Sequence, residues 1–345
     1  MLKNQVKRAV ITGGLEAAYI LQSLRLLSGA RGRGAVFTLH HVRPYMPRQA
    51  PINAHLEITP EFLDMAIQSL KADGYRFVRL EDVPQILMSG SSDAPFAVFT
   101  LDDGFRDNAE HALPVFQRHG VPFTVFVCKG FSERTHVLWW EILEKLVNQD
   151  GPLEFDSGDG MRRYPLGTLA ERYAAASAIG QAITSNDEAD ATARLVSLAT
   201  ERGIDAGALT KNLVMDANEL RALAAEPLAS LGAHTVSHRA LAVLAENEVT
   251  SELADSADYV ASITGTRPTT FAYPYGDGRS VSDTTIATAG GCGFDVAVTT
   301  RPGTLSATDV NRVIALPRIS LNGHFQKARY VSALASGIPF KLTGG

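Results

Sequence analysis

FAVFTLDDG, at residues 96–104, joins a run of apolar residues directly to two carboxylates and a glycine. The apolar run predicts a buried strand, because it is short and carries no charge. At the carboxyl end of a barrel strand, side chains point into the active site, and neighbouring residues diverge. Asp102 and Asp103 could therefore serve different partners in one site. The alternative is an ordinary turn, since Asp-Gly is a common turn pair.

Short apolar runs of this kind alternate with amphipathic stretches along most of the chain. Besides 96–101, strands are predicted at residues 35–40, 75–80, 121–128, 231–234, 269–273, 294–299 and 314–319. Helices are predicted between them, at residues 59–74, 108–119, 247–264 and 282–289, with a further helix start at Asp216. Repeated strand–helix units indicate a parallel sheet, and this many strands suggest a barrel, open or closed.

The pattern changes between residues 131 and 213, where alanine-rich helical stretches replace the strands. Helices are predicted there at 168–183 and 188–202, and a Gly/Asp patch at 156–160 is predicted to lie between helices. We therefore expect a helical insertion at 131–213 that divides a barrel into residues 35–130 and 214–345, the latter ending in a C-terminal helix. Residues 1–34 are expected to form an N-terminal amphipathic helix.

The composition is that of a packed globular protein, with 45% apolar and 20% charged residues. The formal net charge of −5 argues against nucleic acid as a partner, because phosphate binding needs clustered Lys and Arg. Cys128 and Cys292 are too few for a disulfide framework, so we expect buried, reduced thiols.

The N-terminal stretch has some features of a signal peptide. Lys3, Lys7 and Arg8 precede an apolar stretch, but Glu16 and Arg25 interrupt it and no A-x-A cleavage site follows. A helix packed on the body is expected instead, with a helically spaced apolar stripe of Ala17, Ile20, Leu21, Leu24 and Leu27. We expect a cytoplasmic protein, and association of this helix with a membrane surface is an alternative.

Two later segments carry further candidate site residues. His234 and His238 would converge on one metal if the segment were helical after His234, although two surface histidines are the alternative. Two imidazoles and one carboxylate, with a position left for water, are typical of a catalytic metal site. At residues 271–276, Pro274 and Gly276 bracket a predicted turn that could aim a backbone N–H into a pocket.

Taken together and in this order, the three segments resemble the motifs of the polysaccharide deacetylase family, also called the NodB-homology or carbohydrate esterase 4 family. The T-F-D-D-G motif corresponds to residues 100–104, with Leu101 for Phe, and H-[ST]-x-x-H corresponds to residues 234–238. The R-x-x-P-Y-type motif corresponds in part to residues 272–275. The resemblance covers about residues 35–130 and 214–320. It implies an α/β fold, a distorted (β/α) barrel of the NodB-homology type with a helical insertion.

The resemblance also implies roles for individual residues. Asp103, His234 and His238 would bind a divalent metal, usually Zn²⁺, Asp102 would be the general base for the attacking water, and the backbone N–H of Tyr275 would help to hold the oxyanion. The implied reaction is hydrolysis of the N-acetyl group of a GlcNAc-containing oligo- or polysaccharide. Chitooligosaccharide is the default substrate, and β-1,6-linked GlcNAc polymers are an alternative. Other hypotheses are a non-catalytic, metal-bearing saccharide-binding protein and an amidase acting on a non-sugar amide.

Several positions depart from the family pattern. The arginine that pairs with the base is Ala272 here, so Arg318 on the last predicted strand is favoured as its replacement, with Arg267 as a second candidate. A surface location of Arg318 is the alternative. The proline after the second metal histidine is Arg239, and the tryptophan of the fourth motif is not found after Asp295. The late L-x-H motif is missing, because residues 316–320 contain no histidine.

Residues 39–42, Leu-His-His-Val, contain candidates for the role of the missing histidine. This segment resembles the early Y-H-x-V motif of permuted family members and thereby selects His40 as the general acid. His41 should face the other way, because successive strand side chains alternate. An ordinary imidazole pKa near 6.5 would suit the acid. The alternative is one core and one surface histidine. We also expect the insertion to cover the substrate groove, where Trp139 and Trp140 would either pack between helices or stack on sugar rings.

Overall fold

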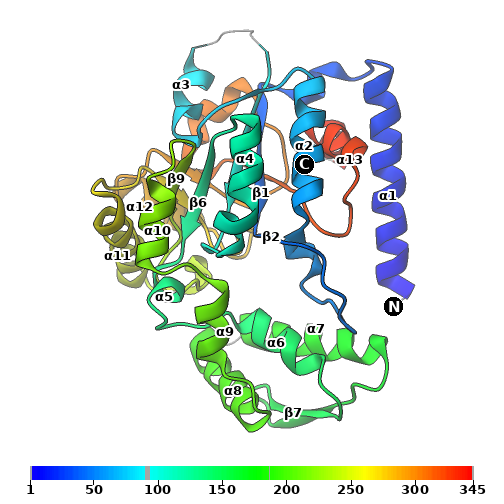
Figure 1. The fold of residues 1–345 in the computed structure, drawn as a ribbon, viewed down its shortest axis with the longest axis vertical. Helices are drawn as coiled ribbons and strands as arrows, with labels where there is room; N and C mark the ends of the chain where they lie inside the picture. Colours follow the sequence, from blue (N-terminus) through cyan, green and yellow to red (C-terminus); the bar gives the residue numbers. More distant parts are fainter. Residues whose placement is uncertain (1, 90–93, 186, 344–345) are drawn as a thin grey trace.

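A curled sheet of eight strands, all paired in parallel, forms the centre of the molecule (Figure 1). Its order is β11 (Val296–Val298), β10 (Thr270–Ala272), β9 (Ala229–Ala233), β6 (Phe123–Val127), β5 (Phe96–Leu101), β1 (Gly34–Leu39) and β12 (Ile319–Ser320), with β4 (Arg76–Phe77) also paired to β5. This computed structural model describes residues 2–89, 94–185 and 187–343. The strand predicted at residues 75–80 is shorter in the structure, where β4 contains only Arg76 and Phe77.

One segment joins the two edges of this sheet. Leu316 bridges to Val298 of β11, and Ile319 pairs with Phe37 of β1, so the sheet curls into the predicted distorted barrel. The predicted last strand at 314–319 is nevertheless wrong in its bounds. A 3₁₀ helix extends to Ala315, and Pro317 has no N–H with which to continue a strand ladder.

Alternation within the strands separates the barrel interior from the helix-covered exterior. Val36, Val98 and Phe126 pack inside, whereas Phe37 and Phe99 pack outward against the surrounding helices. The helices of the body are α2 (Pro60–Ala72), α3 (Val83–Met88), α4 (Leu113–His119), α10 (Ala217–Ala224), α11 (Glu246–Thr264) and α12 (Asp283–Gly291). The side chains of Thr59, Asp216 and Ser282 cap the starts of α2, α10 and α12, whereas α11 begins without a side-chain cap and α3 was not predicted. The helix predicted at 108–119 begins with a π-helical turn, Asn108–Ala112.

A separate layer of helices lies below the barrel in Figure 1. It contains α6 (Trp139–Val147), α7 (Leu169–Ser185), α8 (Glu188–Glu201) and α9 (Ala206–Leu213), has its own apolar core, and is joined to the barrel through the short α5 (Lys129–Ser132). The Gly/Asp patch at 156–160 does not lie between helices, as we expected. It forms the turn of a hairpin, β7 (Leu153–Asp156) and β8 (Met161–Tyr164). Only Leu153 and Phe155 of this hairpin are buried, so its apolar pattern is too short to reveal a strand.

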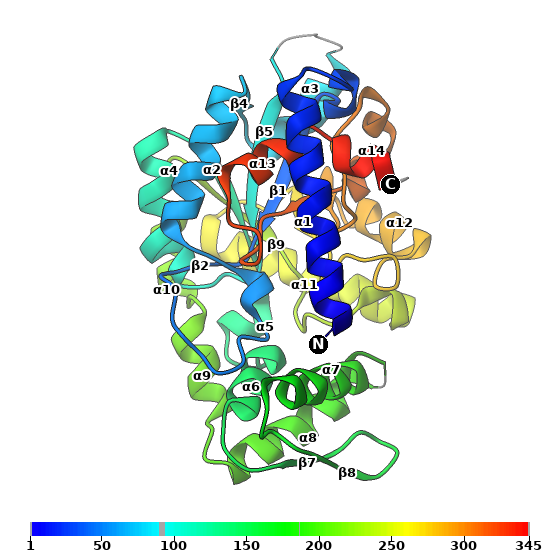
Figure 2. The ribbon, with the colours of Figure 1, turned by 90° about the vertical axis from the view of Figure 1, so that its right-hand side faces the viewer.

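The N-terminal helix α1 (Leu2–Ser23) packs along the C-terminal helices α13 (Ala328–Ala335) and α14 (Ile338–Thr343), as Figure 2 shows. The apolar stripe that we predicted to pack on the body is not the side of the helix that does so. Leu15 and Ala18 are the buried residues, whereas Ile20, Leu24 and Leu27 are exposed. This orientation lets Glu16 pair with Arg329 of α13 and accept a hydrogen bond of 2.6 Å from Tyr330 Oη.

A buried ion pair ties the barrel to the helical layer. His41, in the short strand β2 (His41–Val42), contacts Asp107 through Nδ1 at 2.5 Å, and its Nε2 lies 3.8 Å from Glu141 of α6. Its ring also stacks on Phe105 with a centroid separation of 3.6 Å. Burial lowers the pKa of His41, but the Asp107 carboxylate more than offsets this effect and raises the pKa to about 9.

His41→Ala should therefore destabilise the fold. The substitution leaves two buried carboxylates without their cation, a change that costs about 3–5 kcal/mol of unfolding free energy. Because the folded-state pKa is raised, the contribution of the pair is complete below pH ~6.5 and is lost as the pH rises through about 9. Urea unfolding should show a difference from wild type that shrinks across this interval. His111→Ala is the control, and an equal difference at both ends would contradict the assignment.

Candidate active site

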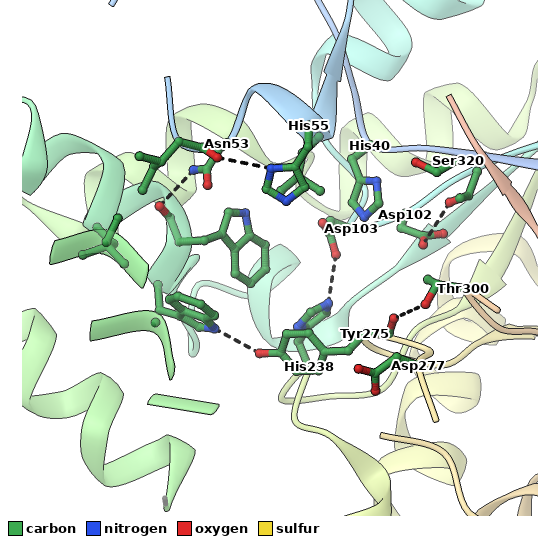
Figure 3. Close-up of a pocket in the computed structure, with 18 of the residues that line it drawn as sticks. His40, Asn53, His55, Asp102, Asp103, His238, Tyr275, Asp277, Thr300 and Ser320 are labelled. Atoms are coloured by element: carbon green, nitrogen blue, oxygen red, sulfur yellow. Dashed lines mark hydrogen bonds and ion pairs between the residues drawn. The ribbon is translucent and has the colours of Figure 1, made fainter. Parts of the chain in front are cut away.

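A cavity of about 590 Å³ opens at the carboxyl ends of the barrel strands (Figure 3). Asp102 and Asp103 follow β5, His234 follows β9, and Tyr275 lies in the turn after β10. Each strand is buried, so these polar residues stand where the apolar sequence of each strand ends. The structure thus brings together the candidate residues of all three sequence segments.

Asp103, His234 and His238 form a buried cluster. Oδ1 of Asp103 lies 3.5 Å from Nε2 of His234 and 3.3 Å from Nε2 of His238, and it accepts no hydrogen bond from the described residues. Nδ1 of His234 donates to the carbonyl oxygen of Ala272 at 2.7 Å, which leaves the Nε2 lone pair facing Asp103. Ligands at ~2.1 Å from a tetrahedral metal are separated by about 3.4 Å, so these donors fit a divalent cation.

The two histidines converge through a turn and not through a helix. Thr235 and His238 have left-handed φ values of 63° and 60°, and the helix after His234, which the sequence analysis gave as the condition for convergence, is absent from this described segment. Oε2 of Glu252 accepts hydrogen bonds from the backbone N–H groups of Val236 and Ser237, at 2.7 and 2.9 Å, which holds the turn. Glu252 belongs to α11, and nothing in the local sequence links it to the motif.

Asp103 also has a left-handed backbone, with φ 74°, and this turn separates it from Asp102. The alternation of β5 places Val98 and Asp102 on the inside of the barrel, beside Arg318. The adjacent carboxylates therefore face different partners, as the sequence predicted.

Arg318 forms a bidentate ion pair with Asp102, with Nη1–Oδ1 and Nη2–Oδ2 distances of 2.8 and 2.7 Å. Its side chain is buried, so the alternative of a surface arginine is wrong. The other candidate, Arg267, pairs with Asp258 on the surface. Burial raises the pKa of Asp102, but the Arg318 guanidinium more than offsets this effect, so the carboxylate is ionised at neutral pH.

Arg318→Ala should lower kcat with little change in KM, since Arg318 contacts the candidate base rather than the open part of the cavity. Loss of the cation should raise the pKa of Asp102, so the acid limb of the pH–rate profile should move to higher pH. Because an unpaired buried carboxylate also weakens folding, Arg318→Lys is the companion variant and should retain part of the activity. An unchanged profile in a folded variant would contradict this role.

His40 lines the cavity beside Asp102 and Asp103 (Figure 3). His41 is instead buried in the protein, where it pairs with Asp107. The expected alternation is therefore present, and the alternative of one core and one surface histidine is wrong for His40. The expectation of an ordinary imidazole pKa is also wrong. Burial lowers the pKa of His40 to about 4, although the two carboxylates partly oppose this change.

Tyr275 connects the turn after β10 to the helical layer. Its backbone has φ 59°, and its N–H donates no hydrogen bond to the residues that the structure describes. Its hydroxyl donates to Glu188 at 2.6 Å and accepts from Nε1 of Trp139 at 3.0 Å. Oγ1 of Thr300 donates to the Tyr275 carbonyl at 2.5 Å. The N–H is thus free for a ligand, while the side chains of Glu188, Trp139 and Thr300 hold Tyr275 in place.

The helical layer supplies much of the cavity wall. Its lining residues are Trp139, Trp140, Leu143, Tyr173, Ala176, Ser177 and Gly180, and the loop before α2 adds Ile52, Asn53, His55 and Leu56. Trp139 packs against Gly180, and Trp140 lies against Phe131 and His238, so both rings pack within the protein and also border the cavity. Sequence analysis missed the loop residues and Asp277, because no pattern marks them as cavity residues.

Tyr275→Phe should test whether the link to the helical layer positions the free N–H. The substitution keeps the backbone but removes both side-chain hydrogen bonds, so we expect kcat to fall roughly 10- to 10²-fold with KM nearly unchanged. Glu188→Gln retains an acceptor and should remain close to wild type. The exposed Tyr45 provides the control, Tyr45→Phe. Equal activity of Tyr275→Phe and wild type would remove the positioning role.

A buried Asp-His-His cluster beside an ion-paired carboxylate, at the mouth of a (β/α) barrel, is typical of metal-assisted hydrolases. The sequence matches the family profile described as polysaccharide deacetylase over residues 89–157 and 173–297, more than half of the chain. The chain therefore belongs to the polysaccharide deacetylase family. The matched ranges include parts of the helical layer.

Solved structures give the same fold. The deacetylase PplD of Streptococcus pyogenes is 19% identical, with a TM-score of 0.55 over 84% of this chain and 92% of that chain. IcaB of Ammonifex degensii is 16% identical, with a TM-score of 0.54 over 88% of this chain and 98% of that chain. A search of curated proteins found no match. At these identities the structural likeness supports the fold alone.

Proposed function

We propose that this chain hydrolyses the N-acetyl group of GlcNAc residues in an oligo- or polysaccharide, with chitooligosaccharide as the reference substrate. The observation that carries the proposal is the division of labour between two adjacent carboxylates. Asp102 is held ionised by Arg318, while Asp103 faces the two histidines. The family match supports the same chemistry. PplD, whose fold this chain shares, is a deacetylase whose structure was solved in complex with acetate.

Asp103, His234 and His238 are the residues that would hold a divalent cation, and Zn²⁺ is the first candidate for this donor set. Such a cation, when bound, polarises the amide carbonyl and lowers the pKa of water to ~7. The protein residues would perform the remaining steps. Asp102 accepts a proton from the attacking water, and the backbone N–H of Tyr275 donates to the oxygen on which negative charge develops.

His40 is our candidate for delivering a proton to the leaving nitrogen. Because its pKa is lowered to about 4, it is neutral at pH 7 before substrate binds. The proton that it delivers would therefore be the one that Asp102 removes from water. The water oxygen forms a bond to the carbonyl carbon, the C–N bond breaks, and acetate and a free amine result.

The replacement of the motif arginine by Ala272 raised the hypothesis of a binding protein without turnover. The Arg318–Asp102 ion pair favours an active enzyme, because it supplies the positive charge from another part of the chain. We therefore retain the binding protein and the non-sugar amidase only as outcomes of the substrate test.

Acetate release from a matched set of substrates tests the proposal. Acetylated chitotetraose, a β-1,6-linked GlcNAc tetramer and an acetylated lysine peptide should be compared at equal concentrations. We expect release from a GlcNAc oligosaccharide and none from the peptide. Release from the peptide alone would indicate an amidase of another class, and metal binding without release from any substrate would indicate a binding protein.

A further inference from the structure

Helix α1 and the segment after it expose many large apolar side chains. Their exposed fractions lie between 36% and 68%, and the residues are Val6, Val10, Ile11, Tyr19, Ile20, Leu24, Leu26 and Leu27. They make up half of the large apolar side chains that are exposed in the described residues. Such a concentration in one element marks an interaction surface, because exposed apolar residues normally occur singly.

The helix is apolar on two opposite sides. Leu15 and Ala18 pack against α13 and α14, while Val10 and Ile20 lie on the other side of the helix. A helix that is apolar on both sides is usually covered on both sides. In Figure 1, α1 lies at the right-hand edge of the molecule, and in Figure 2, where this side faces the viewer, no other described element lies in front of it. The covering partner must therefore come from outside the described residues.

The charge of this region points to the chemistry of the partner. Residues 1–34 contain six basic side chains and one acidic side chain, although the whole chain has a formal net charge of −5. The single acid, Glu16, is paired with Arg329 of the body. The apolar side of α1 is thus accompanied by an excess of positive charge in an otherwise acidic protein.

We propose that α1 binds an anionic lipid surface, with its outward apolar side in the membrane interface and its basic residues near the head groups. No helix within the described ranges is long and apolar enough to cross a membrane. A second copy of the chain is a poorer partner, because an isologous contact would place two basic surfaces against each other.

Cosedimentation with vesicles tests this proposal on the full chain. Vesicles of phosphatidylcholine should be compared with vesicles that contain about 30% phosphatidylglycerol, at low and at high salt. We expect the wild type to bind the anionic vesicles at low salt. Its affinity should be at least about tenfold lower for the neutral vesicles, and at least about tenfold lower for the anionic vesicles at high salt.

Two sets of variants separate the apolar contribution from the electrostatic one. The double variant Val10→Glu, Ile20→Glu should reduce binding at least about tenfold, whereas Met161→Glu, Val243→Glu alters equally exposed apolar residues elsewhere and should bind like wild type. The triple variant Lys3→Gln, Lys7→Gln, Arg25→Gln should weaken binding to anionic vesicles only. Unchanged thermal unfolding would show that each variant is folded.

Three results would overturn the proposal. The first is that the wild-type protein stays in the supernatant. The second is that the test and control double variants lose binding equally. The third is that the wild type binds no vesicles but forms a dimer, which Val10→Glu, Ile20→Glu converts to a monomer. The last result would assign the surface to a second copy. Acetate release from a soluble substrate should be the same in all these variants, which keeps this test independent of the proposed function.

Discussion

Asp102→Asn is expected to retain one bound metal per chain and to lose roughly 10²–10⁴-fold in turnover. An amide keeps the shape of the carboxylate but cannot accept a proton from water. Asp102 pairs with Arg318 and is not one of the three clustered donors, so its replacement should leave Asp103, His234 and His238 in place. Metal content by elemental analysis and acetate release from chitotetraose should be measured on the same preparation.

Asp103→Asn is the matched variant, because it makes the same chemical change one residue away. It should lose both the metal and the turnover, since Asp103 is the only carboxylate in the cluster of three donors. His234→Ala and His238→Ala should likewise lose the metal. Equal metal loss in Asp102→Asn and Asp103→Asn would contradict the division of labour, as would full metal content after removal of either histidine.

His40→Ala should also retain the metal and lose roughly 10²–10⁴-fold in turnover, because the leaving nitrogen would then depart without a proton donor. Since the pKa of His40 is lowered to about 4, the wild-type rate should show no alkaline limb near pH 6.5. The profile of kcat/KM between pH 5 and pH 9 provides the measurement.

His41→Ala is the neighbouring control for this prediction. It should lower stability, as argued above, while the turnover of the remaining folded protein stays within a few fold of wild type. Full activity of His40→Ala would remove the early histidine from the mechanism. Greater loss of turnover in folded His41→Ala than in His40→Ala would exchange the two assignments.

Much of this arrangement could be predicted because it depends on local patterns. The strand at Phe96–Leu101 is indicated by its short apolar run. The helix at Pro60–Ala72 is indicated by its apolar periodicity and by the N-cap Thr59 directly before it. The different surroundings of His40 and His41 agree with the alternation predicted for strand side chains, although His40 lies in the bend between β1 and β2. Both patterns can be recognised in a single sequence without any knowledge of the tertiary structure.

The features that sequence analysis missed depend on contacts between distant segments. Glu252, on α11, holds the turn between His234 and His238, the candidate metal ligands, and Glu188 reaches Tyr275 from the helical layer. The low pKa of His40 results from burial beneath a layer whose position the sequence does not reveal. The β7–β8 hairpin was missed because β8 has three exposed residues followed by the half-buried Tyr164, so its sequence lacks the apolar alternation that predicts a strand.

The central claim is that a metal held by Asp103, His234 and His238 is required for deacetylation. Acetate release from acetylated chitotetraose should be followed while a chelator removes the metal and Zn²⁺ is then titrated back, with metal content measured at each point. We expect activity to disappear with the metal and to return in proportion to occupancy, up to one ion per chain. Acetate release that continues undiminished in metal-free protein would contradict it.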